Sequence, residues 1–266
     1  MDINLGDIRE DAMYRINQSI FSIAPNADFT DFESQTKVLC NEFLILAAAS
    51  LLADMKPSMF FLNLCRCAEN WRRFSNLSQS CFYRLPTLLY NIPYYAAVIA
   101  NDKQLIQKLI NTMPEEWSKG EEYEAQFHET CLIMLLSANN VKQDKNIIKH
   151  LSLLEACEAD GAQTILTKAL LGLDELTADD FWAQFEASLY EHIEEVEERA
   201  QMASTSITHF AAYRFIWFKG LAWLRLAKIR GFEFPSSGYI YCPEEALLPM
   251  PEAYKGDWII MPDMKL

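Results

Sequence analysis

Apolar residues recur every three or four positions along almost the whole chain, and this spacing restricts the fold more than any other feature. Between residues 7 and 24, for example, Ile8, Ala12 and Ile16 fall on one side of a helix, and Pro25 ends the pattern. Glycine is scarce, at 8 of 266 residues, which disfavours folds that depend on tight turns or phosphate-binding loops. The spacing therefore predicts an all-α protein.

Prolines, glycines and capping residues divide this pattern into ten predicted helices. They cover residues 7–24, 31–54, 59–76, 85–100, 103–112, 121–138, 143–159, 162–171, 177–202 and 206–230. About 65% of the chain would then be helical, well above the ~30–35% of an average globular protein. Ser58 is the expected N-cap of the third helix. Gly231 is expected to end the last helix, which we place at the centre of the core.

The last part of the chain, residues 232–266, contains five prolines and several large aromatic side chains, so we expect an irregular tail packed across the helices. The predicted architecture is an antiparallel helical bundle or a short solenoid of about ten helices. It forms one domain, 1–266, or two packed halves, 1–140 and 141–266. Residues 102–109 resemble 144–151 at the spacing of a two-helix repeat, so the solenoid stays an alternative to the bundle.

Sequence motifs for catalysis or metal binding are missing. There is no glycine-rich phosphate loop, no G-x-S-x-G and no H-E-x-x-H, and Cys65 and Cys67 would point to different faces of a helix. His128 beside Glu124 and Glu129, or His192 among Glu191, Glu194 and Glu195, could act as a general base, but on an acidic helical chain such a histidine is more often a surface residue. The chain is predicted to have no enzymatic activity, no cofactor and no metal.

Cysteine usage and the first residues indicate the cytoplasm. The seven cysteines are odd in number and lie mostly in apolar helical patterns, as buried reduced thiols do. Residues 1–11 hold four acidic residues and one arginine, unlike a secretory leader. The most apolar stretch, residues 43–53, is too short to span a bilayer.

Charge gives the strongest indication of a partner. The formal net charge of −14 disfavours nucleic acid and anionic membranes and favours a basic protein. Residues 169–198 contain no lysine or arginine, and their apolar residues repeat at helical spacing, so the carboxylates there cover the outer face of one helix. We call five of them the acidic strip: Glu191, Glu194, Glu195, Glu197 and Glu198. The strip is either a docking surface for a basic partner or a solvated face that keeps the protein soluble.

The tail supplies a second set of candidate binding residues. Tyr239, Tyr241, Tyr254 and Trp258 are of the types that are enriched at binding hot spots. Tyr239, Tyr241 and Trp258 are therefore candidate anchors for the partner. The alternative is that these rings pack inward and hold the tail on the helices.

Residues 217–231 form a long apolar segment that ends in Arg230 and Gly231, followed by Tyr239-Ile-Tyr-Cys-Pro243 and then Leu247. This section of about fifty residues resembles the closing section of bacterial immunity protein family forty-nine, whose members neutralise polymorphic toxins. A second helical immunity group ends similarly, with a long helix and a Tyr-Pro segment.

The resemblance implies a helical protein without catalysis that binds one cognate toxin domain over or beside its active site. The acidic charge fits a basic toxin, such as a nuclease or a toxin that uses a nucleotide cofactor, acting in the cytoplasm. Two alternatives stay open. One is a helical-repeat scaffold or adaptor that binds a basic protein partner, and the other is a hydrolase that uses His128 with Glu124 or Glu129.

Overall fold

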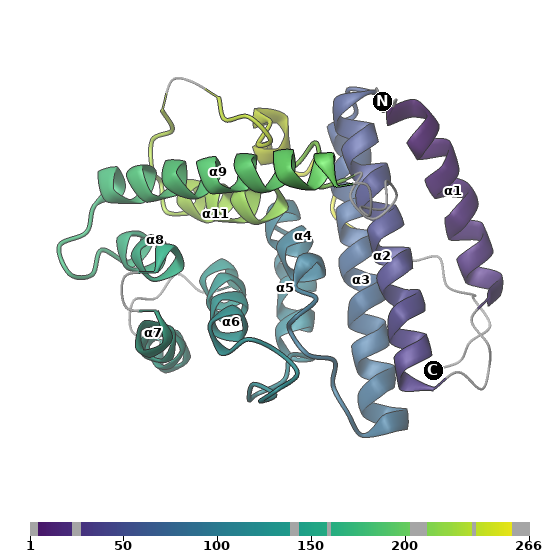
Figure 1. Cartoon of the computed structure of the whole chain (residues 1–266), viewed down its shortest axis with the longest axis horizontal. Helices are drawn as coiled ribbons and strands as arrows, with labels where there is room; N and C mark the ends of the chain where they lie inside the picture. Colours follow the sequence, from purple (N-terminus) through teal and green to yellow (C-terminus); the bar gives the residue numbers. More distant parts are fainter. Residues whose placement is uncertain are drawn as a thin grey trace.

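The protein is all-α. The computed structural model describes residues 5–22, 28–138, 144–158, 161–202, 212–235 and 238–256. These residues contain ten α-helices and one 3-10 helix, no strand longer than an isolated bridge, and 71% of them are helical (Figure 1). The predicted fold class is confirmed, including the irregular character of the tail over its described part.

The helices have the following bounds. They are α1 Leu5–Ser22, α2 Phe29–Leu52, α3 Pro57–Phe82, α4 Ile92–Ala100, α5 Lys103–Ile110, α6 Glu124–Ala138, α7 Lys145–Cys157, α8 Ala162–Leu171, α9 Ala178–Gln201, α11 Phe218–Ile229 and the 3-10 helix η1 Glu244–Leu247.

The helices form two groups, which α4 and α11 connect. Helices α1, α2 and α3 lie side by side on one flank of the molecule, and α6, α7 and α8 lie on the other (Figure 1). Between them α4 packs on α3, α6 and α11, while α9 and α11 run across the direction of α1–α3. Buried apolar residues form one continuous cluster, from Ile8 in α1 to Leu247 in η1, because every helix contributes an apolar stripe to it.

Helix α2 is the one described helix with the length and hydropathy of a membrane-spanning segment. About two thirds of its apolar window (67%) is buried inside the fold, largely against α1 and α3. Tertiary packing within the molecule therefore accounts for its apolar composition.

Local capping signals set several helix ends as predicted. Asp102 accepts a hydrogen bond from the Leu105 amide at 2.9 Å, and α5 begins at the next residue. Gly231 has φ +78°, and its amide and that of Phe232 donate to carbonyls in the last turn of α11. This is a Schellman arrangement, and it confirms Gly231 as the residue that ends the helix.

The prediction of one continuous helix over 206–230 is wrong. Residues 212–215 form turns, residues 216–217 are irregular, and α11 begins only at Phe218, while residues 206–211 lie outside the described part. The Trp217 amide donates to the Tyr241 carbonyl at 2.8 Å, so the tail takes the hydrogen bond that a longer helix would need. The Trp217 ring also folds over Gly220, where an added Cβ would lie 2.0 Å from it. Only glycine permits this close approach.

Several other helix boundaries also differ from the prediction, such as the end of α3 at Phe82, and the causes of two differences are clear. The N-cap of α3 is Lys56 and not the expected Ser58. The helix begins at Pro57, because proline fits the first turn of a helix. The predicted helix over 85–100 begins only at Ile92. The loop before it is fixed by a distant residue, since the Glu122 carboxylate accepts from the Leu88 amide at 2.7 Å. A contact across 34 residues is invisible to local spacing.

A buried guanidinium ties the tail to the core. Arg225 lies in the middle of α11 and donates to four backbone carbonyls: Ile99 at 2.9 Å, Ala246 at 3.0 Å, Leu247 at 2.8 Å and Leu248 at 3.1 Å. We call this set the Arg225 clasp. Burial lowers the pKa of Arg225 to about 10, which leaves it charged at neutral pH. The clasp therefore satisfies a buried cation with carbonyl oxygens and no described carboxylate.

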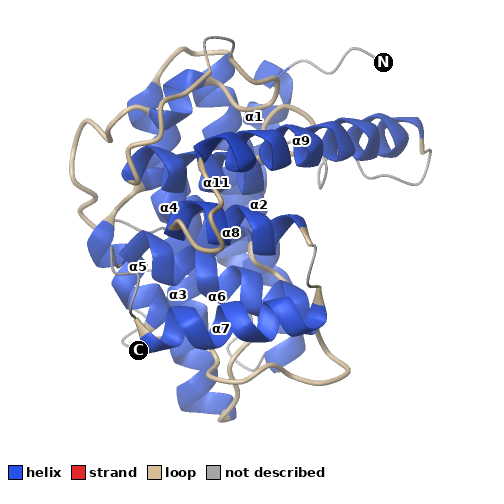
Figure 2. Ribbon diagram, turned by 90° about the vertical axis from the view of Figure 1, so that its left-hand side faces the viewer, coloured by secondary structure: helices blue, strands red, loops and turns tan. Residues whose placement is uncertain are grey.

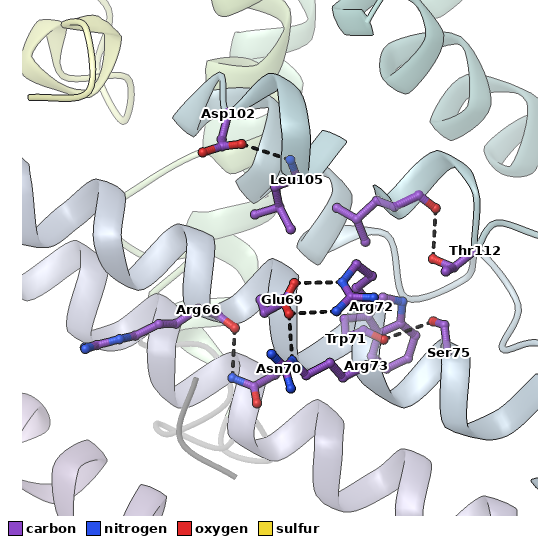
Figure 3. A network of polar contacts seen from close by, with 11 residues as sticks. Arg66, Glu69, Asn70, Trp71, Arg72, Arg73, Ser75, Asp102, Leu105 and Thr112 are labelled. Atoms are coloured by element: carbon purple, nitrogen blue, oxygen red, sulfur yellow. Dashed lines mark hydrogen bonds and ion pairs between the residues drawn. The ribbon is translucent and has the colours of Figure 1, made fainter. Parts of the chain in front are cut away.

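A second buried polar cluster lies within α3 (Figure 3). The Glu69 carboxylate accepts from Arg72 Nε and Nη2, both at 2.7 Å, and from Arg73 Nε at 2.6 Å. Burial raises the pKa of Glu69, but the hydrogen bonds from the two arginines outweigh this effect and lower it below its usual value. The cluster keeps a buried carboxylate ionised on an amphipathic helix.

Candidate functional site

The acidic strip lies on α9, whose start and inner face are fixed by local chemistry. Thr177 and Asp180 form a capping box, in which the Thr177 amide donates to the Asp180 carboxylate at 2.7 Å. Phe181, Phe185 and Leu189 are buried at helical spacing and attach α9 to the body of the molecule. The opposite face is therefore left to the carboxylates.

All five glutamates of the acidic strip are exposed. Figure 2 shows that one end of α9 extends beyond the packed helices. Glu195 forms an ion pair with Arg199 one turn later, while both side chains stay about half exposed. The predicted solvent-facing position of the strip is thus confirmed, whereas its use as a docking surface stays a prediction.

The two described tail tyrosines that were candidate anchors pack on the same helix. The Tyr239 ring lies 6.2 Å from the Trp182 ring and 5.0 Å from the Phe185 ring, and its hydroxyl donates to Glu186 at 3.4 Å. Burial, followed by Glu186, raises the pKa of Tyr239 to about 12. Tyr241 meets the His192 ring edge to face at 5.7 Å.

These contacts bring the tail and α9 together. They use the two rings for internal packing and leave each only partly exposed. Tyr254 is also partly buried, and Trp258 lies outside the described residues. The structure therefore assigns Tyr239 and Tyr241 a packing role and says nothing of Trp258.

A pocket of about 870 Å³ opens beside the inner edge of the acidic strip. We call it the α9 pocket. Its lining residues lie within six segments: 91–95 around the start of α4, 123–129 at the start of α6, 154–158 at the end of α7, Gln163 of α8, 192–199 of α9, and 213–219. Because six segments meet there, nothing in the local sequence pattern indicated it.

The lining of the α9 pocket includes several acidic and aromatic side chains. Its carboxylates are Glu124, Glu129, Glu158 and Glu195, and its cations are Arg199 and Lys219. Glu129 is buried and binds Lys219 at 2.7 Å. The rings of Tyr95, Trp217 and Phe218 also line the pocket, and Tyr123 is 75% exposed there. Aromatic rings beside carboxylates are well suited to bind a cation.

Two buried histidines lie behind Glu124. The Nδ1 atoms of His128 in α6 and His150 in α7 are 3.0 Å apart, and Glu124 Oε1 is 3.9 Å from His128 Nε2. Burial lowers the pKa of both rings, that of His150 to about 4, with His128 and Lys149 as the further causes for His150. At neutral pH both rings are therefore uncharged, and one Nδ1 donates to the other.

This arrangement disfavours a catalytic use of His128. The residue is 3% exposed, and its Nδ1 is occupied by His150. The thiol that lines the pocket, Cys157, has its pKa raised by burial and then by Glu124 and Glu158. A raised pKa disfavours the nucleophilic thiolate. All seven cysteines are free thiols, and no group of three metal-ligating side chains occurs in the described part of the chain.

The histidine pair gives the protein a pH-dependent stability. We expect the free energy of unfolding to fall by roughly 2 kcal/mol between pH 6.5 and pH 4. The unfolded rings take up protons near pH 6.5, whereas the folded His150 resists protonation down to about pH 4 and burial also lowers the pKa of His128, so acid favours the unfolded state. Denaturant titrations at several pH values measure the effect.

The matched variant replaces His128 and His150 with asparagine, whose amide can occupy the Nδ1 position. We expect it to lose much of this slope and to keep the part due to His192, whose pKa burial and then Arg199 lower to about 4. An unchanged slope in this variant would mean that other groups cause the acid sensitivity.

Comparisons of the chain with protein-family models, with curated proteins and with solved structures find no match. The resemblance to immunity protein family forty-nine therefore depends on the residues in the C-terminal third alone. The described geometry defines an all-α protein with an exposed acidic helix and an adjoining acidic pocket.

Proposed function

We propose that this protein is an immunity protein, which binds a cognate antibacterial toxin in the cytoplasm and neutralises it by covering its active site. The observation that carries the proposal is the acidic strip on α9, which lies next to the α9 pocket. Its five exposed glutamates belong to a stretch, residues 169–198, that contains no lysine or arginine. The resemblance of the C-terminal third to immunity family forty-nine supports the same function.

The chemistry of the surface favours a basic toxin domain. Toxins that attack nucleic acid or use nucleotide cofactors tend to present basic clefts, and an acidic inhibitor associates quickly with such a target. With a net charge of −14, the protein itself is a poor ligand for nucleic acid or an anionic membrane. Its role needs binding alone, with no catalytic group, cofactor or metal.

Co-expression with a candidate toxin gene, sought in the neighbourhood of this gene, tests the function directly. We expect the intact protein to restore growth of a cell that makes the toxin, and a purified complex to form from the two proteins. Failure of both would reject the immunity function. A complex that forms without restoring growth would favour the alternative, a helical scaffold or adaptor that binds a basic protein.

Neutralising the acidic strip should slow association with the toxin. In a variant with all five glutamates changed to glutamine, we expect the association rate constant to fall about tenfold at low salt and to lose most of its salt dependence. The dissociation rate should change little, because the strip attracts the partner over a distance. Stopped-flow or biosensor kinetics at several salt concentrations measure both rates.

The control variant removes five exposed carboxylates elsewhere: Asp7, Glu10, Asp11, Glu244 and Glu245. It changes the net charge by the same amount and leaves α9 intact. An equal loss in both variants would show that overall charge attracts the toxin, and that the acidic strip has no special part.

A further inference from the structure

The α9 pocket contains negative charge that its own residues leave uncompensated. Lys219 neutralises Glu129, and Arg199 neutralises Glu195. Within the described residues, Glu158 has no ion-pair partner, and Glu124 lies 3.9 Å from a histidine that is uncharged at neutral pH. Two carboxylates are therefore available for a cation from outside.

Both available carboxylates line the α9 pocket. Cys157 lines the pocket and is exposed, and its pKa is raised by burial and then by Glu124 and Glu158. Glu124 comes from the first turn of α6 and Glu158 from the C-cap of α7, so the packing of these two helices brings the charges together. A single ligand can meet both.

The pocket also offers aromatic surfaces. His192 lines it, and its Nε2 atom is buried without a hydrogen-bond partner in the described structure. The ring stacks on Trp217 at 5.0 Å, and it is uncharged at neutral pH. That nitrogen is enclosed and is not offered to a ligand, whereas the exposed Tyr123 adds a ring at the rim that can lie against a planar cation.

We infer that the α9 pocket receives an arginine side chain of the partner protein, held by Glu124 and Glu158. Arginine fits better than lysine because its planar guanidinium presents five donors and stacks on aromatic rings. The inference rests on the proposed function in taking the toxin as the source of this arginine. It adds to that function a fixed anchoring point, separate from the long-range attraction of the acidic strip.

A small arginine derivative tests the pocket without the toxin. The probe is N-acetyl-arginine methylamide, the control ligand is its citrulline analogue, which has a similar shape and no charge, and the readout is alkylation of native cysteines by iodoacetamide. Cys157 lies in the pocket, and Cys81, which is also exposed, lies at the end of α3 and serves as the internal reference. Mass spectrometry follows the two sites in the same sample.

We expect millimolar arginine derivative to slow the alkylation of Cys157 several-fold and to leave Cys81 unchanged, with no effect of the citrulline analogue. Changing Glu124 and Glu158 to glutamine should abolish this protection. Changing the exposed Glu115 and Glu116 to glutamine removes the same charge and should preserve it. Equal protection by both ligands, or none by either, would overturn the arginine pocket.

The complex with the toxin separates this inference from the proposed function. We expect bound toxin to protect Cys157 and to leave Cys81 reactive, and the Glu124→Gln/Glu158→Gln variant to dissociate about tenfold faster. If the toxin is neutralised while Cys157 stays reactive and the variant dissociates normally, the pocket is not the anchor and the immunity function stands. If no complex forms, both fail.

Discussion

Replacing Leu226 with aspartate should unfold the protein. Leu226 is 0% exposed in α11, which packs on α4, α6 and α8. The substitution places a charge without a partner in the apolar core and also removes buried apolar volume, so we expect a loss of more than about 5 kcal/mol. A loss of this size equals or exceeds the stability of many natural domains. Circular dichroism and the melting temperature of the purified variant measure it.

Two variants define the scale of the Leu226 effect. Leu226→Ala keeps the core apolar, and we expect it to cost about 2–5 kcal/mol while the fold persists. Ala187→Asp places the same charge on the exposed face of α9 and should have little effect on melting. Unchanged melting of the Leu226→Asp variant would mean that α11 is a peripheral helix.

Replacing Arg225 with methionine should free the tail from the helical body. The variant loses four hydrogen bonds of the Arg225 clasp and leaves several carbonyls buried without a donor. Each unsatisfied group costs about 1–3 kcal/mol, although relief of the buried charge offsets part of the loss. We expect a net destabilisation of about 3 to 5 kcal/mol, measured by denaturant unfolding.

The same variant should expose the tail before the rest of the molecule. Limited proteolysis and amide hydrogen exchange are expected to show early cleavage and rapid exchange in residues 238–256. Lys228→Met is the matched control, since Lys228 donates one hydrogen bond to the Leu247 carbonyl at 2.9 Å and should cost only about 1 kcal/mol. A tail as well protected in the Arg225 variant as in this control would contradict the clasp.

Elements fixed by neighbouring residues could be predicted from the sequence. The cap of α5 at Asp102 and the end of α11 at Gly231 are set within one helical turn, so their local signals were sufficient. The start of α11 is set by Tyr241 and by the fold of Trp217 over Gly220. A period of apolar residues carries no information about such contacts, and it extended the helix too far.

The candidate site likewise has one part that local sequence signals predict and one part that they do not. Exposure of the acidic strip follows from helical periodicity, because the stripe of Phe181 and Phe185 must face the core. The α9 pocket depends on six segments that meet only in the folded chain. Arg225 carried a weak signal that was overlooked: it is a charged residue in a helix that is otherwise apolar on nearly all sides. Such an arginine cannot reach water and must find acceptors inside.

The Arg225 clasp fixes the path of the tail without depending on which side chains the tail carries. The guanidinium binds main-chain oxygens, and every amino acid supplies the same oxygen, so the side chains at positions 246–248 are not what it recognises. Substitutions at the exposed Leu248 would leave the anchorage unchanged. The C-terminal segment can thus diversify its outward-facing residues while keeping its route over the molecule.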